Sequence, residues 1–565
     1  MDVGQFLAEF RHIANAPQGV KRLRDLVLAL AVQGRLVLQD PAEEPAEVQL
    51  DRIRATALAS PVAGNRRKPA AARDPETTPS ATLPGGWATA RLCELVRVLN
   101  GRAYSKPELL ESGTPVLRVG NLFTSDRWYY SSLQLEDDKY CEAGDLLYAW
   151  SASFGPFLWQ GERVIYHYHI WKLDLFNHEA LDKRFLHLWL LERTQEIKAA
   201  GHGINMAHMT KEKFEQFVVA LPPRAEQSRI VAKVDQLMGL CDQLEKQQQE
   251  RRRLQNALRR STLGALTSAH GPSELQRGYR HLVANFDQLC SAPEDAVDLE
   301  QCIKQLALKG LLTSRVTGEE VSGHVVGLTE SSGAVEESAR DWPIPGHWVW
   351  ARCGWLGEAR LGKMLDASKN RGSLKPYLRN VNVRWRHFRL QDILQMRVED
   401  HELPRITVRR GDLVICEGGE PGRAAIWERD DEFVIQKALH RFRCGPDVIP
   451  EYLLFCLEHD FFSGRLSRYY TGATIKHLTG KALAEYPIPL PPIDEQKRLI
   501  EAARQLSVEI ASLGDRLGET SRCARMLAVA AISTLTGIAV EREDVSVKAC
   551  LQTAASAGLA CSVLF

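Results

Sequence analysis

The sequence lacks the spacings and runs that mark several protein classes. It has twelve cysteines but no Cys-x-x-Cys pair, which argues against a zinc ribbon and gives no readable disulfide framework. Its longest apolar runs, such as residues 26–32, fall far short of the ~20 residues that cross a membrane. The N-terminus carries acids early and has no apolar core of signal-peptide length. We therefore expect a cytoplasmic protein with reduced thiols and no contact with a membrane.

Familiar catalytic motifs are also missing. Neither G-x-S-x-G nor H-E-x-x-H occurs, and there is no Gly-rich cofactor loop combined with an Asn/Asp-Pro-Pro-aromatic tetrapeptide. His167 and His169 fall on one face of a strand, but no further ligand with recognisable spacing accompanies them. A packed histidine pair is the favoured interpretation. The sequence predicts a chain without catalytic residues, bound metal or bound cofactor.

Charge bias is absent from the chain as a whole. The 565 residues carry a net charge of +1, so a basic surface must be local. Residues 352–389 provide such a region, with ten Lys or Arg against two acids. Trp385, His387 and Phe388 are interleaved with them, and Asn380 and Asn382 lie within the run. Arg, Lys and Asn suit phosphates and purine edges, so we favour a nucleic-acid surface over a solvated basic face.

What is present is an internal repeat. LPPRAEQSRI, from Leu221, returns as LPPIDEQKRL, from Leu490, 269 positions later. LPGGW matches IPGHW, GDLLYAW matches GDLVICE, and LAVQGRLV matches LALKGLLT, with offsets from 261 to 276. Nearly the whole chain is therefore two copies of one unit. We expect, in order, a helical segment (1–58), a linker (59–82), a mixed domain (83–223), a spacer helix (224–270), a second helical segment (271–321), a linker (322–341), a second mixed domain (342–492), a second spacer helix (493–541) and a tail (542–565).

The two spacer helices have apolar seams with heptad-like spacing. Alternating steps of four and three residues keep such a seam on one side of a supercoiling helix. The two seams can pair with each other, antiparallel if a twofold axis relates the units; alternatively, each packs on its own domain. The seam residues are Ile230, Val234, Leu237, Cys241 and Leu244 in the first helix, and Leu499, Ala503, Leu506, Ile510, Leu513 and Leu517 in the second.

The two mixed domains share a frame but differ in the loop after the Gly-Asp strand. SASFG follows GDLLYAW in the first copy, whereas EGGEPGR follows the corresponding strand in the second. Shared frames with divergent loops fit two domains that recognise different sequences. The candidate DNA-binding residues are Arg102, Arg118, Asn121, Ser151, Ser153, Asn205 and His208 in the first domain, and Lys363, Arg379, Asn380, Asn382, Glu420, Arg423, Thr474, Lys476 and His477 in the second.

These motifs together resemble the specificity subunit of type I restriction-modification enzymes, in its longer branch. The resemblance rests on the doubled LPP-x-x-EQ, LPGGW/IPGHW and GDLL/GDLV motifs, on EGGEPGRAAIW, and on the N-terminal LRDLVLALAVQGRLV. It implies an α+β fold in which two target recognition domains, each recognising half of a split site in double-stranded DNA, are joined by long helices paired as an antiparallel coiled coil.

The resemblance also implies partners. Two modification subunits would dock on the helical segments, among them the seam-bearing helices, and methylate adenine, and restriction subunits would add cleavage. S-adenosylmethionine, ATP and Mg would bind those partners and not this chain. A specificity subunit for a fused, type II-like methyltransferase and endonuclease is the alternative.

Overall fold

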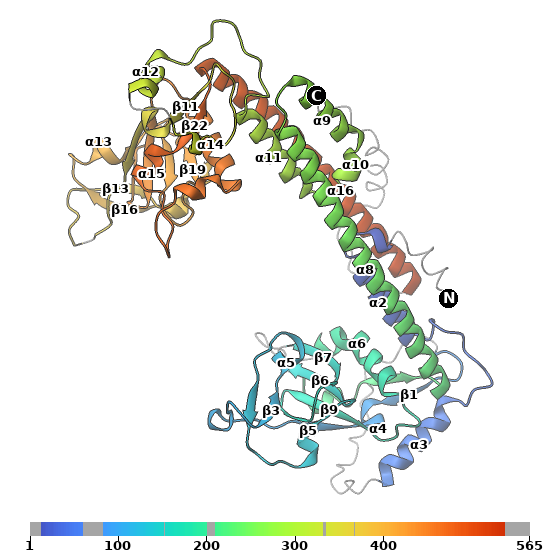
Figure 1. Cartoon of the computed structure of the whole chain (residues 1–565). Coiled ribbons are helices and arrows are strands. Elements are labelled where there is room, and N and C mark those ends of the chain that lie inside the picture. The colour runs from blue at the N-terminus through green and yellow to red at the C-terminus, as the bar shows by residue number, and fades with distance from the viewer. Residues whose placement is uncertain are drawn as a thin grey trace. The chain divides into compact units, whose positions relative to one another are not determined.

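We describe a computed structural model of the chain over residues 13–59, 83–151, 153–199, 209–331, 335–366 and 368–536 (Figure 1). It divides into two compact units: one takes the described residues up to Glu250 together with α16 from Ser521, and the other takes Arg251–Thr520. Within the described residues, no helix is both long and apolar enough to cross a membrane. The predicted tail, residues 60–82 of the first linker, Asn205 and His208 lie outside the described residues.

The first mixed domain consists of two four-stranded sheets closed by a short ribbon. In the ribbon, β1 (Ala88–Arg91) pairs antiparallel with β10 (Val218–Leu221), so the two ends of the domain meet. One sheet has the order β2-β9-β6-β7, and the other β4-β3-β8-β5. The strands are β2 (Val96–Asn100), β3 (Thr114–Leu117), β4 (Tyr129–Ser131), β5 (Tyr140–Cys141), β6 (Leu146–Ser151), β7 (Ser153–Leu158), β8 (Val164–Tyr166) and β9 (Ile170–Leu175); the helices are α4 (Leu92–Leu95), η2 (Lys106–Glu108), α5 (Val119–Phe123), η3 (Asp137–Lys139), α6 (Lys183–Ala199) and α7 (Lys211–Phe214).

The second mixed domain has the same topology. Its ribbon is β11 (Val349–Arg352) with β22 (Pro487–Leu490), and its sheets have the orders β12-β21-β18-β19 and β16-β13-β20-β17. A small hairpin of β14 (Val383–Arg384) and β15 (His387–Phe388) is added. The other elements are η5 (Cys353–Trp355), β12 (Gly357–Leu361), β13 (Ser373–Leu378), η6 (Asn380–Asn382), β16 (Leu394–Val398), α13 (Leu403–Ile406), β17 (Thr407–Val408), β18 (Leu413–Cys416), β19 (Ala424–Ile426), β20 (Phe433–Ile435), β21 (Leu439–Cys444), α14 (Pro450–Phe462), η7 (Arg465–Tyr469) and α15 (Gly480–Glu485).

The repeat predicted from the sequence is confirmed by strand pairing. In each domain, one pair in an otherwise antiparallel sheet is parallel: β3 with β8, and β13 with β20. The structure gives the reason for the repeated Gly-Asp pair, which forms the same turn in both domains. Gly144 and Gly411 have φ of 93° and 88°, which glycine adopts without strain. The carboxylates of Asp145 and Asp412 then accept a hydrogen bond from the backbone N–H three residues earlier, at 3.0 and 2.8 Å, so both turns are locked.

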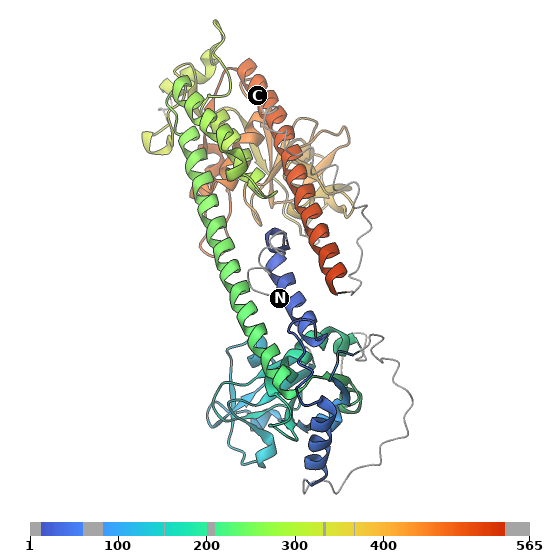
Figure 2. The same ribbon diagram turned by 90° about the vertical axis from the view of Figure 1, so that its right-hand side faces the viewer.

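The helical segments lie beside the long helices. In the first unit, α2 (Gly19–Val32) lies between the first part of α8 (Arg224–Thr267) and the last part of α16 (Ile493–Thr536) (Figure 2). Arg24 pairs with Asp242 and Glu245 of α8, both at 2.7 Å. α3 (Ala46–Ala59) follows α2. The shared core of these helices includes Val20, Leu23, Val27, Ile230, Val234, Leu237, Cys241 and Ala528.

In the second unit, α11 (Asp295–Leu308) takes the place of α2, after α9 (Pro272–Ala284) and α10 (Phe286–Leu289). Arg259 of α8 reaches Asp295 at the start of α11, and Lys309 just after it donates to the Thr267 carbonyl at 2.5 Å, so α8 and α11 run parallel. α16 runs the opposite way, because its early residues share a core with the end of α11. The antiparallel orientation of α8 and α16 is therefore confirmed within this unit.

The seam residues are covered by this chain itself. Each seam packs on the other long helix and also on α2 or α11, so the pairing and own-domain alternatives both hold in part. Eight of the seam residues mark the helices predicted to bind partners; six of these are at most 4% exposed and two are half-buried, as seam pairing requires. Partner docking on these helices stays a prediction. The six are Ile230, Val234, Leu237, Leu499, Ile510 and Leu513, and the half-buried pair is Leu244 and Leu506.

One predicted linker is folded. The polar composition of residues 322–341 predicts a segment without packed structure, but they contain α12 (Gly323–Ser331) and η4 (Glu337–Ala339). Val325 of α12 is fully buried in the core of the second domain. α12 occupies the position in the second copy that α3 occupies in the first. The polar composition of this segment gave no indication of that helix.

Candidate nucleic-acid interface

The Gly-rich loop of the second domain, residues 417–423, connects β18 to β19 and lies between two other predicted loops. On one side, Arg423 Nη2 donates to the Asn380 carbonyl at 2.9 Å. On the other side, Gly418 forms a β-bridge with His477. The fold thus brings together three loops that are separated in sequence, and with them the predicted residues Asn380, Glu420, Arg423, Thr474, Lys476 and His477.

The backbone of the Gly-rich loop is constrained by hydrogen bonds and packing. Residues 420–423 form a turn in which Arg423 N–H donates to the Glu420 carbonyl at 3.2 Å. Proline at the second position and Gly422 at the third, with φ of 94°, make it a type II turn. A Cβ on Gly422 would lie 2.2 Å from Leu466 Cδ2. Tyr470 OH also donates to the Pro421 carbonyl at 2.6 Å, so the side chains at the loop's tip are presented from a fixed backbone.

A short hairpin, residues 471–477, flanks the Gly-rich loop. Its ends are joined by paired backbone hydrogen bonds between Thr471 and His477, at 2.8 and 2.9 Å. Thr474 and Lys476 between them are exposed, and Ile475 is 65% exposed. This hairpin therefore presents a hydroxyl, an ammonium group and an apolar side chain beside the Gly-rich loop.

Two of the predicted asparagines build turns. Asn382 Oδ1 accepts from the Arg379 N–H at 2.9 Å, and its amide nitrogen donates to the Arg389 carbonyl at 3.0 Å. In the first domain Asn121 Oδ1 likewise accepts from the Arg118 N–H, at 3.1 Å. Asn382 is fully buried, so its predicted direct contact with DNA is wrong for this conformation. These side chains hold the turn that carries an arginine.

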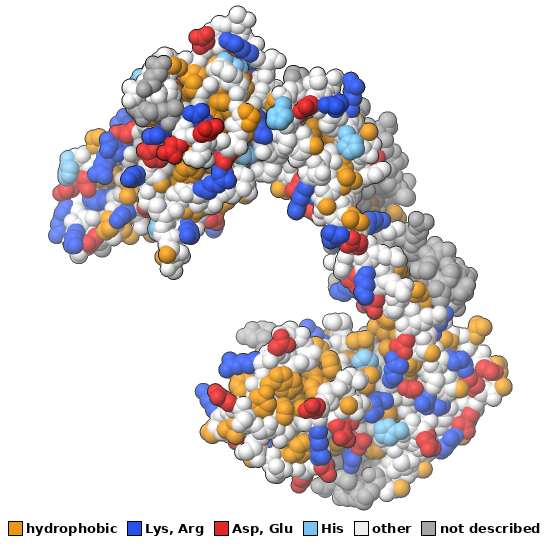
Figure 3. Space-filling view, in the orientation of Figure 1, with side chains coloured by type: hydrophobic (Ala, Val, Ile, Leu, Met, Phe, Trp, Pro, Cys, Tyr) orange, Lys and Arg blue, Asp and Glu red, His pale blue; other side chains and the backbone are white. Residues whose placement is uncertain are grey.

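The basic run is less positive than its sequence suggests, because the fold brings acids to it from elsewhere. Lys363 pairs with Glu402, and Arg379 with Asp392 at 2.8 Å. Figure 3 shows Lys and Arg side chains along the edge of the domain that carries β13 and β16, with acids among them. Over the described part of the run, the cations without an acid within 4.0 Å are Arg371, Lys375, Arg384 and Arg389.

The first domain shares one ion pair with the second but differs at other equivalent positions. Arg102 pairs with Glu108 at 2.6 Å, as Lys363 pairs with Glu402 in the second domain. The Arg118 guanidinium lies over the Tyr129 ring, 5.2 Å from its centroid. Two further predicted residues are less accessible: Ser151 is 1% exposed and Ser153 is half-buried.

An aromatic cluster in the first domain was not predicted as part of the site. Trp150 stacks on Trp171 with centroids 5.4 Å apart, and its indole N–H donates to the Tyr168 carbonyl at 2.9 Å. Tyr168 is 39% exposed. The neighbouring His167 has its pKa lowered to about 4, first by burial and then by His169 and Arg118, so it is neutral. The stretch YHYHIW, residues 166–171, contains most of this cluster and could have predicted it. Its paired histidines instead suggest a metal site.

Comparison with known proteins shows which family this chain resembles. The model of the type I restriction modification DNA specificity domain matches residues 84–251 and 404–512. The type I restriction enzyme EcoEI specificity subunit of Escherichia coli is 23% identical over 530 residues, which cover 85% of this chain and 88% of that protein. This chain belongs to the type I restriction-modification specificity family. The EcoAI specificity subunit of Escherichia coli is also 23% identical, over 86% of this chain and 89% of that protein.

The family model matches both copies of the repeat, in each case through a mixed domain into its long helix. A chain in a solved structure of a type I restriction-modification system is 18% identical to this one, with a TM-score of 0.46, over 81% of this chain and 99% of that chain.

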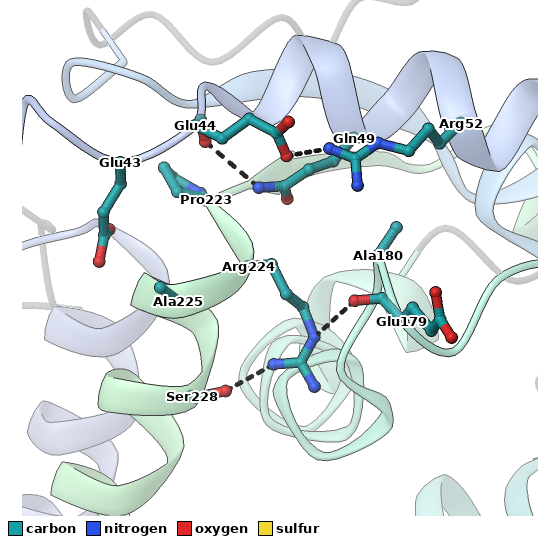
Figure 4. A pocket seen from close by; sticks show the side chains of 10 residues that line it. All are labelled: Glu43, Glu44, Gln49, Arg52, Glu179, Ala180, Pro223, Arg224, Ala225 and Ser228. Carbon is teal, nitrogen blue, oxygen red and sulfur yellow. Dashed lines mark hydrogen bonds and ion pairs between the residues drawn. The ribbon is translucent and has the colours of Figure 1, made fainter.

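The motif that carries much of this specificity-family resemblance joins each domain to its helix. Trp87 Nε1 donates to Glu226 at 3.1 Å, and burial raises the pKa of that carboxyl. The next residue, Gln227, donates to the Pro222 carbonyl at 2.9 Å. A hollow beside this junction is drawn in Figure 4. There Arg224 donates to the Glu179 carbonyl at 3.0 Å, so the polar groups bind one another and the motif is structural.

Proposed function

We propose that this chain is the DNA-recognition subunit of a type I restriction-modification complex, and that each mixed domain recognises one half of a split site in double-stranded DNA. The observation that carries the proposal is the combination of one shared frame with two different surfaces. The sheets have the same order, the Gly-Asp turns have the same hydrogen bonds, and the Arg118–Asn121 and Arg379–Asn382 turns are built alike.

The surfaces on that shared frame differ in chemistry. The second domain offers the exposed side chains of Glu420, Thr474 and Lys476. The first offers the Trp150 and Tyr168 aromatic pair and the Arg118–Tyr129 stack. Two surfaces with different hydrogen-bonding groups favour different bases, which suits an asymmetric split site. Each domain also presents an exposed cation, Arg118 in the first and Lys476 in the second, which would bind phosphate and position the DNA without selecting a sequence.

The proposal extends to partners. Two modification subunits would dock on the two copies of the helical segment and methylate adenine in each half-site, and restriction subunits would add cleavage. S-adenosylmethionine, ATP and Mg would bind to those subunits, and this chain would catalyse nothing. The repetition of the Trp–Glu junction supports two equivalent docking positions. The curated relatives are type I subunits, which favours this assembly over a fused, type II-like partner.

Single-molecule methylation sequencing tests the proposal. A host would express this chain with its neighbouring reading frames, and a matched host would lack only this chain. We expect a new split motif with N6-methyladenine in both halves, present only with the chain. Exchanging residues 151–153 for 417–423 should alter one half of the motif and preserve the other. A motif that persists without the chain would refute the proposal.

A further inference from the structure

Glu420 is an exposed acid of the Gly-rich loop, which lies beside the hairpin that presents Thr474 and Lys476. Its side chain is 55% exposed at the tip of the Gly-rich loop. Oε2 lies 2.7 Å from Arg423 Nη1, whose side chain is only 10% exposed. Among the described residues, none donates a hydrogen bond to Oε1. One carboxylate oxygen therefore pairs with Arg423, and the other is available as an acceptor on a half-exposed side chain.

This placement excludes a phosphate contact. A carboxylate and a DNA phosphate carry the same sign of charge, so Glu420 at the DNA backbone would lower affinity for every sequence. A carboxylate in a DNA interface is favourable opposite an amino group in the major groove. Guanine and thymine present only acceptors there, and both would repel Oε1.

Cytosine suits this acceptor better than adenine. Adenine places the N7 acceptor beside its N6 amino group, and a nearby cation would be needed to satisfy N7. The cation that contacts Glu420, Arg423, is already engaged with it and with the Asn380 carbonyl at 2.9 Å. The other nearby cation, Lys476, stands on the separate hairpin, where we expect it to bind a phosphate. Building on the function proposed above, we propose that Glu420 is a specificity-determining residue of the second domain, which accepts a hydrogen bond from the exocyclic amine of cytosine.

Arg423 acts as a positioning residue for this contact. It fixes one oxygen of Glu420 and ties the Gly-rich loop to Asn380, while the type II turn fixes the backbone between them. The orientation of Glu420 is thus set before DNA binds, so little conformational entropy is lost when the contact forms.

The proposal is tested by asking whether substitutions at Glu420 change the methylated DNA sequence. Methylation motifs would be determined for the wild type, Glu420→Gln and Glu420→Ala, each expressed with its partner reading frames. In Glu420→Gln the amide oxygen should stay on Arg423, which turns the NH₂ group outward as a donor. We expect one C·G pair in one half-site to become T·A or G·C, by a preference of about 10- to 100-fold. Glu420→Ala should leave that pair unspecified.

The control is Glu428→Gln, an exposed acid at the other end of β19, which should leave the motif unchanged. Arg423→Ala should relax the same base pair as Glu420→Ala, and Arg423→Lys should restore part of its preference. The inference is overturned if both Glu420 variants keep the wild-type motif, or if the altered pair is not C·G in the wild type. A wild type that produces no split motif would instead remove the proposed function itself.

Discussion

Trp348 Nε1 donates to Glu495 Oε2 at 3.1 Å, across the point where the second mixed domain becomes α16. The same oxygen lies 2.9 Å from His347 Nε2, and Oε1 accepts from Thr313 Oγ1 at 2.8 Å. Glu495 is 1% exposed. One buried carboxylate therefore joins the domain ribbon, the helical segment and the long helix, and Glu226 makes the same bond to Trp87 in the first unit.

Glu495→Ala should destabilise the protein by about 3 kcal/mol, because it leaves buried donors without an acceptor. Asp494→Ala, at the adjacent exposed acid, is the matched control and should change stability by less than about 0.5 kcal/mol. Urea denaturation followed by circular dichroism measures both. Equal effects of the two substitutions would contradict the role assigned to the junction.

Gly422→Ala should reduce the free energy of unfolding by more than the backbone strain of a positive φ accounts for. Gly411→Ala is the control, because Gly411 has a similar φ of 88° but nothing within 4 Å of the place that a Cβ would take, whereas a Cβ on Gly422 meets Leu466 at 2.2 Å. We expect about 1 kcal/mol for Gly411→Ala and about 2–3 kcal/mol for Gly422→Ala. Thermal unfolding distinguishes them, and indistinguishable melting temperatures would count against the packed loop.

Stability should fall in acid partly through Glu458. Burial raises the pKa of Glu458, but hydrogen bonds and charges from Arg386 and Lys304 outweigh it, so the pKa lies below its usual range. A depressed carboxyl pKa contributes stability above the ordinary value of about 4.3, and that contribution is lost as the pH falls through the folded-state pKa. Glu458→Gln should thus cost on the order of 3 kcal/mol at pH 7 and progressively less below pH ~4. A pH-independent difference between the two proteins in urea titrations would argue against the ion pair.

Lys476→Ala and Arg389→Ala should each weaken DNA binding without changing sequence preference. Both cations are exposed and have no acidic partner among the described residues; Lys476 lies on the hairpin beside the Gly-rich loop, and Arg389 lies beside the Arg379–Asn382 turn. Removing one cation that binds a phosphate should reduce the slope of log affinity against log salt by about 1. Arg410→Ala, which removes an exposed cation paired with Asp430 at 2.8 Å, should leave the slope unchanged. Fluorescence anisotropy across salt concentrations decides this.

The repeat made the fold predictable, because a motif that recurs at a near-constant offset has to serve the same structural role twice. LPP-x-x-EQ could thus be assigned to the start of each long helix from the sequence alone. The site was harder to predict. Asn121 and Asn382 have the chemistry of base contacts but are used by local turns, and Lys363 and Arg379 are paired by acids distant in sequence. Such partners are set by tertiary packing, which cannot be read from a local sequence pattern. Trp150 was missed for the same reason, because its indole stacks on Trp171 of the paired strand β9 rather than on a sequence neighbour.

The core around α2 is closed by residues that the ribosome makes about 500 positions apart. Arg22 Nη1 donates to the Arg525 carbonyl at 3.3 Å, 503 positions later, and Ala528 is 1% exposed in the same core. While the ribosome is still making the second domain, the apolar face of α2 lacks one of its covering helices. The first unit therefore completes its fold only after α16 is synthesised, so an incomplete chain carries an uncovered apolar face, which chaperones or proteases can recognise before an unfinished subunit enters a complex.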